Sequence, residues 1–235
     1  MQVIYDMALY TSNAAHLDPH AHEALRTACL SPKLLGTSPL LGTFAATYGF
    51  AVSFTRPGID ALLQQYPFFA PFCAMILQTA QTKPVLPWMR RFSFRPNAFY
   101  LNVLAIPPGA HVGAHIDATL GAHCKNPGVI PKAVSVYYVQ VPSKPAGGAL
   151  VLHPHEKKKI MLTPTEGHYV VFRGDLPHEV TPYHGKDLRV SLVCEQYQLD
   201  APSLRAMRPM HVQSKGQFAA VLREHMRQHA LGVVS

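Results

Sequence analysis

Residues 98–117 read AFYLNVLAIPPGAHVGAHID, and this stretch decides how the rest of the chain is interpreted. It opens with an apolar run, is interrupted by Pro-Pro-Gly, and ends in His115-Ile116-Asp117. Short runs of β type with glycine and proline between them continue to Tyr197. Such a series of short strands and turns, without helical patterns between them, indicates an antiparallel sandwich or barrel. The predicted strands are Phe99–Ile106, Ala133–Val141, Ala149–His153, Lys159–Leu162, His168–Phe172 and Leu188–Tyr197.

The segments on either side of this β core have a more helical pattern. Asp18 followed by Pro19 predicts the N-cap and first turn of a helix that runs to about Cys29. Apolar residues at helical spacing predict further helices at Ile59–Gln65, Phe72–Ala80 and Gly216–His229. A strand is predicted at Tyr48–Phe54. We therefore expect a single domain over 1–235, with a mixed helical N-terminal support (1–97), a β core (98–200) and a C-terminal helical tail (201–235).

Composition narrows the class of protein. Of 235 residues, 48% are hydrophobic and 14% are charged, which excludes a disordered chain. Lys and Arg number 21 against 13 Asp and Glu, but the basic residues are dispersed, so no nucleic-acid partner is expected. The four cysteines form no CxxC pair, and neither a signal peptide nor a bilayer-length apolar run is expected from the sequence pattern. A cytoplasmic protein with no membrane partner is expected; the oligomeric state stays open.

His115-Ile116-Asp117 is the first part of a candidate metal site. On a strand, residues two apart point to the same face, so the imidazole and the carboxylate would lie side by side. His178 follows in Pro177-His178-Glu179-Val180. Two histidines and one carboxylate are the ligands of the facial triad of non-haem Fe(II) oxygenases, which leaves positions open for substrate and O2. A second copy of the pattern, His16-Leu17-Asp18, is better explained by Asp18 as a helix cap.

Arg189 and Ser191 form a candidate anion clamp downstream of His178. The two residues lie in the predicted strand Leu188–Tyr197 and share a face by the same two-residue period. A guanidinium holds a carboxylate through two parallel hydrogen bonds, and a neighbouring hydroxyl can add a third. An iron triad beside such a clamp is the layout needed for a 2-oxoacid with a distal carboxylate.

With these residues in order, the chain resembles the 2-oxoglutarate/Fe(II)-dependent dioxygenases, and their prolyl-hydroxylase-like branch most closely. The resemblance covers roughly residues 98–198. The segments that carry it are Asn102–Gly109, His115–Asp117, Val136–Val139, Gly147–Leu150, Val171–Phe172, Pro177–Val180 and Arg189–Ser191.

This resemblance implies a mainly β (α+β) fold with flanking helices around a double-stranded β-helix core of the jelly-roll, cupin-like kind. It implies Fe(II) bound by His115, Asp117 and His178, with O2 and 2-oxoglutarate as cosubstrates and ascorbate as a supporting reductant. Arg189 and Ser191 would hold the distal carboxylate of 2-oxoglutarate, helped by Tyr138 and by Asn102.

The reaction implied is hydroxylation of an aliphatic C–H bond in an amino acid, a peptidyl residue or a related small metabolite, with release of succinate and CO2. Two alternatives stay open at this stage. One is an oxidative nucleic-acid demethylase, although the second arginine of the DNA-repair demethylases, six residues after the first, is here Glu195. The other is a cupin-like metal-binding protein without enzymatic activity.

Overall fold

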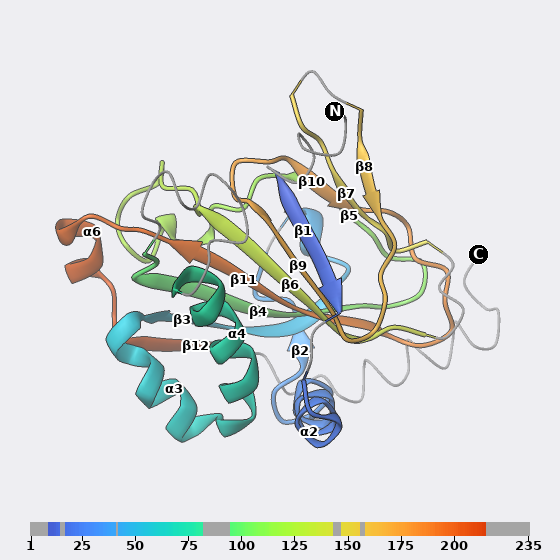
Figure 1. The fold of residues 1–235 in the computed structure, drawn as a ribbon, viewed down its shortest axis with the longest axis horizontal. Helices are drawn as coiled ribbons and strands as arrows, with labels where there is room; N and C mark the ends of the chain where they lie inside the picture. The colour runs from blue at the N-terminus through green and yellow to red at the C-terminus, as the bar shows by residue number, and fades with distance from the viewer. Residues whose placement is uncertain are drawn as a thin grey trace.

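The computed structural model describes residues 9–14, 17–40, 42–81, 95–142, 147–155 and 158–214. Its core is two antiparallel sheets (Figure 1). The main sheet has the strand order β1-β9-β6-β11-β4-β3-β12, with the short β2 paired to β3. Its strands are β1 (Tyr10–Ala14), β2 (Gly36–Thr37), β3 (Tyr48–Thr55), β4 (Ala98–Ile106), β6 (Ala133–Gln140), β9 (His168–Arg173), β11 (Arg189–Tyr197) and β12 (Met210–Ser214).

The smaller sheet has the order β5-β10-β7-β8. Its strands are β5 (Val112–His115), β7 (Leu150–Leu152), β8 (Ile160–Leu162) and β10 (His178–Val180). Apolar side chains of β6 and β9 pack against Leu150 and Leu152 of β7, so the smaller sheet covers one face of the main sheet. A mainly β fold with flanking helices, as predicted, is confirmed.

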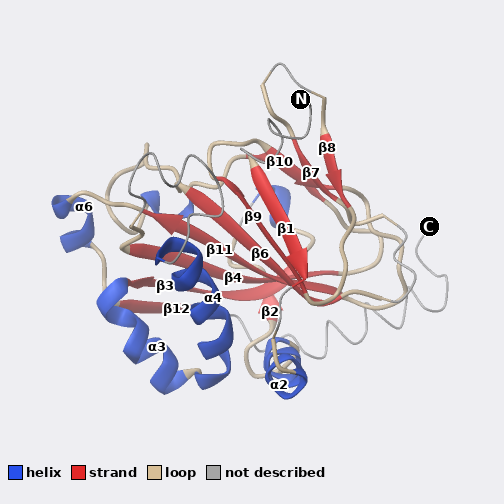
Figure 2. Cartoon of the chain, viewed as in Figure 1, coloured by secondary structure: helices blue, strands red, loops and turns tan. Residues whose placement is uncertain are grey.

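Helices cover the opposite face of the main sheet (Figure 2). They are α2 (Pro19–Cys29), α3 (Ile59–Gln65) and α4 (Ala70–Gln81), and a short α6 (Ala201–Ala206) follows β11. The Asp18 carboxylate accepts a hydrogen bond from the Ala21 amide at 3.0 Å, so this residue caps α2 as its sequence predicts. Because the main sheet is covered on both faces, every residue of β4 is buried.

Strand β11 shows how the two faces divide the side chains. Val190, Leu192 and Cys194 pack in the core beneath the helices. The alternate residues Arg189, Ser191, Val193 and Glu195 face the smaller sheet and line a pocket. The period of two therefore places a row of polar groups between the two sheets.

The structure departs from the predicted elements at both ends of the chain. The N-terminal region contributes β1 and β2 to the main sheet in addition to the predicted β3, and residues 201–214 contain the strand β12 after the short α6. The helix predicted at Gly216–His229 lies outside the described residues. No described helix combines the length and the apolar character that crossing a bilayer requires.

Candidate active site

A pocket with about 520 Å³ of empty space lies between the main sheet and the smaller sheet. The main sheet contributes polar side chains from β4, β6 and β11, and the smaller sheet contributes His115 and His178. Most of the remaining wall is aliphatic, with Leu104, Val136 and Val180 among its members. Such a mixture, apolar walls with a few convergent polar groups, is typical of a small-molecule site.

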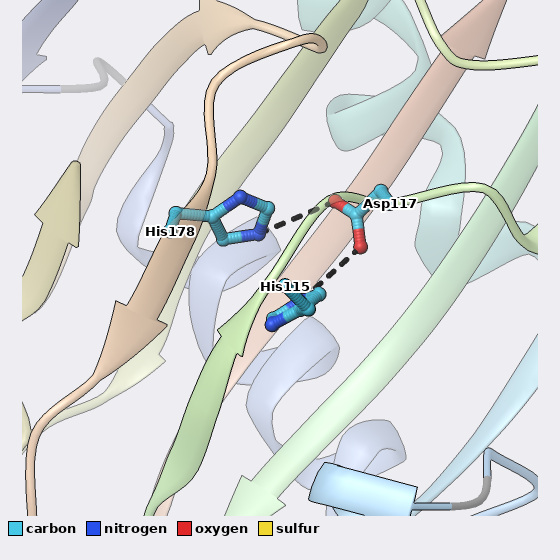
Figure 3. A group of neighbouring side chains, drawn as sticks. All are labelled: His115, Asp117 and His178. Carbon is cyan, nitrogen blue, oxygen red and sulfur yellow. Dashed lines mark ion pairs between the residues drawn. The ribbon is translucent and has the colours of Figure 1, made fainter. Parts of the chain in front are cut away.

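His115, Asp117 and His178 converge in this pocket (Figure 3). Their ligand atoms all lie within 4.8 Å of one another. The Asp117 carboxylate lies between the two rings, with Oδ1 at 3.4 Å from His115 Nε2 and Oδ2 at 3.5 Å from His178 Nε2. This is the one group of three or more metal-ligating side chains found within the described ranges.

Backbone carbonyls orient both imidazoles. His115 Nδ1 lies 2.8 Å from the Gly113 carbonyl oxygen, and His178 Nδ1 lies 3.0 Å from that of Leu176. A carbonyl can only accept, so Nδ1 carries the proton in each ring. In the neutral rings both Nε2 lone pairs are then directed at the centre of the group, the state in which imidazole binds a metal.

The local electrostatics also favour a cation at the centre. Burial raises the pKa of Asp117, but the two neighbouring histidines outweigh this effect and hold its pKa below the usual value. Burial lowers the pKa of His178, which favours the neutral, metal-binding form. For His115, burial also lowers the pKa, but the Asp117 carboxylate outweighs it and the net shift is upward.

Asp117 is placed beside the histidines by a loop and not by the two-residue period of a strand. Strand β5 ends at His115, so Asp117 lies beyond it in a loop. Two residues later, Thr119 donates from Oγ1 to Glu195 Oε1 at 2.6 Å and from its amide to Oε2 at 3.1 Å. These bonds tie the loop to β11 of the main sheet. The expectation that His115 and Asp117 share one face of a strand was therefore wrong, because the strand ends at His115. The two side chains nevertheless meet, through the path of the loop.

Arg189 lines the pocket and is only 1% exposed. Its Nε and Nη1 have no hydrogen-bond partner in the part of the chain that is described. Three neighbouring lining residues are in the same condition, at Ser191 Oγ, Tyr138 Oη and Asn102 Oδ1. Five buried polar atoms without partners around one guanidinium are costly unless a ligand satisfies them.

Tyr138 packs directly on this guanidinium. Arg189 Cζ lies 5.0 Å from the centre of the Tyr138 ring. Burial raises the pKa of Tyr138, an effect that the Arg189 charge partly offsets, and burial lowers the pKa of Arg189. A buried positive charge with only a neutral phenol beside it still needs an anion.

Two parts of the pocket were missed in the sequence. Leu40 and Phe44 enter it from the N-terminal region, and the Phe44 ring meets that of His115 edge-on at 4.9 Å between centroids. Glu195 also lines the pocket. In the sequence, this residue was considered only because it replaces the second arginine of the DNA-repair demethylases. Glu195 lies an even number of residues after Arg189 and Ser191 in the same strand, so the two-residue period could have predicted that it faces the pocket.

The comparisons with known proteins agree with this geometry. Residues 101–194 match the family model of the 2OG-Fe(II) oxygenase superfamily. This segment begins in β4, ends in β11, and contains all three residues of the convergent group. No curated protein sequence matches the chain.

Solved structures show the same fold at low sequence identity. A prolyl-4-hydroxylase from Pseudomonas putida has a TM-score of 0.56 at 19% identity, over 84% of this chain and 98% of its own. A prolyl hydroxylase from Trichoplax adhaerens, solved with a hypoxia-inducible-factor peptide fragment, gives 0.56 at 12%, over 82% and 84%. A viral collagen prolyl hydroxylase from Paramecium bursaria Chlorella virus-1 gives 0.50 at 14%, over 80% and 96%.

These matches confirm the predicted double-stranded β-helix. The superfamily uses Fe(II), 2-oxoglutarate and O2, and a His-Asp-His group able to hold a metal is present. Residues 101–194 are therefore similar to the 2OG-Fe(II) oxygenase superfamily, and the chain has the fold of the prolyl hydroxylases.

Proposed function

We propose that the protein hydroxylates an aliphatic C–H bond of an amino acid, a peptidyl residue or a related small metabolite, and releases succinate and CO2. In this proposal His115, Asp117 and His178 bind Fe(II). Arg189 and Ser191 bind the distal carboxylate of 2-oxoglutarate, with Tyr138 and Asn102 beside them.

The observation that carries the proposal is the set of unpartnered polar atoms around Arg189. A guanidinium with two free nitrogens, a serine hydroxyl and a phenol offers four donors to one carboxylate. The Asn102 amide oxygen, also without a partner, can only accept. The donors and the His-Asp-His group line the same pocket, as a cosubstrate that reaches both requires.

Each side chain then has a defined task. His115 and His178 present Nε2, and Asp117 supplies the negative charge that retains a divalent cation. Arg189 fixes the far end of the cosubstrate, remote from the reacting atoms. Bound Fe(II), with 2-oxoglutarate and O2, supplies the oxidising power for the attack on the C–H bond. The aliphatic walls exclude water from the site.

An aliphatic target agrees with the rest of the pocket. Apart from the His-Asp-His group and Arg189, Glu195 is the one acidic or basic side chain among its lining residues. Leu40 and Phe44 add apolar surface to the pocket, and the Phe44 ring lies beside His115. A peptide is one candidate substrate, since the structurally similar prolyl hydroxylase from Trichoplax adhaerens was solved with a peptide fragment.

A succinate-release assay tests the proposal. Purified protein with Fe(II), ascorbate and 2-oxoglutarate should release succinate even without a primary substrate, and a screen over amino acids and peptides should increase the rate. His178→Ala and Asp117→Ala should abolish release, whereas His155→Ala, at an exposed position, should not change it. Succinate release that survives the loss of His178 would overturn the assignment of the ligands.

Arg189 has a matched control in Arg173, which is about 40% exposed and ion-paired with Asp175. Arg189→Ala should raise the KM for 2-oxoglutarate much more than it lowers kcat, because it removes a contact remote from the chemistry. Arg173→Ala should leave both constants unchanged. An oligonucleotide arm of the screen tests the demethylase alternative, which requires salt-dependent binding. Metal binding without succinate release in any arm would instead favour the cupin-like binder.

A further inference from the structure

A second pocket, with about 560 Å³ of empty space, lies at the β12 edge of the main sheet. The polar side chains that line it are Ser53, His123, Arg208 and His211. Ser53 and His211 are paired residues of β3 and β12, and Arg208 precedes β12. His123 comes from the segment after Asp117, and its ring centroid lies 6.0 Å from that of His211.

The strand register places this pocket on the same face of the sheet as the oxygenase pocket. His211 is paired with Ser53, Ser53 with Tyr100, and Tyr100 with Glu195, which lines the oxygenase pocket. Directly paired residues of neighbouring strands have their side chains on the same face. With β11 and β12 three strands apart, the two pockets are separated by roughly 14 Å along this row, at about 4.8 Å per strand.

Side chains behind His123 orient its ring. The buried Tyr100 donates its hydroxyl to Gln213 Oε1 at 3.1 Å, which directs the Gln213 amide nitrogen to His123 Nε2 at 3.4 Å. Because an amide nitrogen can only donate, His123 Nε2 accepts and its proton lies on Nδ1. The neutral ring therefore keeps one N–H donor that the network does not use.

The charge in this pocket has no acidic counterpart. No Asp or Glu is among its lining residues, and within the described ranges Arg208, His123 and His211 take part in no ion pair. Burial lowers the pKa of His123, and the proximity of His211 lowers it further. A guanidinium, two imidazoles and a serine hydroxyl around one hollow are the donors that an oxyanion selects.

We infer that Ser53, His123, Arg208 and His211 form a second anion-binding pocket, which takes a phosphate or carboxylate group and is distinct from the Arg189 clamp. This inference does not depend on the proposed hydroxylase activity, because it rests on donors that lie outside the oxygenase pocket.

Calorimetric titration of the metal-free full-length protein at about pH 6.5 tests the inference, with inorganic phosphate in one arm and acetate in the other. We expect saturable binding in at least one arm. Binding of phosphate alone supports a phosphate ligand, and binding of acetate alone supports a carboxylate ligand. No saturable binding in either arm would overturn the inference.

Variants locate the binding. His123→Gln and Arg208→Gln should each weaken it by about tenfold, the effect of losing one charge-assisted hydrogen bond. Arg205→Gln removes an arginine that does not line the pocket and should leave the affinity unchanged. Unchanged affinity in Arg208→Gln would show that the anion binds elsewhere. Arg208 is exposed, so its substitution remains informative if His123→Gln proves unstable.

Discussion

At the scale of single residues, Glu195 links the loop after Asp117 to the main sheet. It is 3% exposed, and its carboxyl group accepts hydrogen bonds from Thr119 and from the Tyr197 hydroxyl. Asp117 lies two residues before Thr119, so these bonds fix the backbone that presents the carboxylate proposed to bind the metal. Outer contacts of this kind tune metal affinity through the ligand that they orient.

Thr119→Val should therefore weaken metal binding while leaving the fold intact. The substitution removes the hydroxyl donor to Glu195 and keeps the backbone donor. We expect Mn(II), used as a redox-stable substitute for Fe(II), to bind roughly tenfold more weakly, as for other outer-contact substitutions. Titration followed by electron paramagnetic resonance measures this affinity. Thr27→Val, on the exposed part of α2, is the matched control, and equal affinities in both variants would contradict the prediction.

Glu195 also makes the stability of the metal-free protein dependent on pH. Burial, with a further contribution from the Asp117 charge, raises the pKa of Glu195 from 4.5 to about 8. Between pH 4.5 and about 8 the folded state keeps a proton on Glu195 that the unfolded state has lost, so stability falls as the pH rises through this range. The stabilising contribution of the group is therefore complete only below pH 4.5. Its contribution falls as the pH rises and is lost above about 8. Urea unfolding of the metal-free protein from pH 5 to 8 should show this decline, and Glu195→Gln should flatten it. A parallel slope in the two proteins would rule out Glu195 as the source.

At the scale of secondary structure elements, apolar runs were predicted well and short polar strands were not. The runs at Tyr48–Phe54 and Phe99–Ile106 become β3 and β4 within one residue, because their own burial determines their conformation. In contrast, β1 reads YTSNA and β12 reads MHVQS. Neither has a strong pattern of its own, and each is a strand because a neighbouring edge offers unpaired backbone groups.

One of two glycines in the turn before β7 determines how much space the Arg189 side chain has. Gly147 and Gly148 both have positive φ, and a Cβ at Gly148 would lie 3.1 Å from Arg189 Cδ and 3.1 Å from Tyr183 Cδ2. In the sequence the Gly-Gly pair marked only a turn before a strand. In the structure, the absence of a side chain at Gly148 leaves the room that the Arg189 side chain occupies.

Gly148→Ala should displace the Arg189 guanidinium from the position in which we propose that it binds the carboxylate of 2-oxoglutarate. We expect the KM for 2-oxoglutarate to rise about tenfold, roughly the loss of one charge-assisted hydrogen bond, with a smaller change in kcat. Steady-state kinetics of succinate release measure both constants. Gly128→Ala is the control, because nothing lies within 4 Å of a Cβ at that position. An unchanged KM in Gly148→Ala would mean that Arg189 does not contact the cosubstrate.

At the scale of the whole molecule, the site depends on segments far apart in the chain. The N-terminal region closes one side of the pocket: Thr43 Oγ1 donates to the Gly113 carbonyl oxygen at 3.3 Å, and Phe44 packs on His115. That His115, Asp117, His178 and Arg189 lie in one pocket could be predicted from their residue types and spacing. The wall at Leu40 and Phe44 could not, because it arises from a contact between segments about 70 residues apart with no pattern in common.

Keeping Arg189 buried without a partner in the ligand-free protein lowers the stability of the whole fold. Its charge is desolvated and two of its nitrogens lack hydrogen bonds. Arg189→Met replaces this group with an apolar side chain of similar length, which the surrounding Tyr138 and Tyr183 can pack against. We expect the free energy of unfolding of the ligand-free protein to rise by about 1–3 kcal/mol, the cost of leaving buried polar groups unsatisfied.

The same substitution should remove stabilisation by the cosubstrate. For the original protein with Mn(II), 2-oxoglutarate at a hundred times its Kd should add about 2.7 kcal/mol, which corresponds to a rise in Tm of roughly 5–10 °C. Arg189→Met should show no such rise while starting from a higher Tm without ligand. Thermal unfolding with and without 2-oxoglutarate measures both effects, and Arg173→Met, at an exposed ion pair, should change neither by more than about 0.5 kcal/mol. A ligand-free Arg189→Met protein less stable than the original would mean that the guanidinium is already satisfied without an anion, and the assignment of the clamp would then fail.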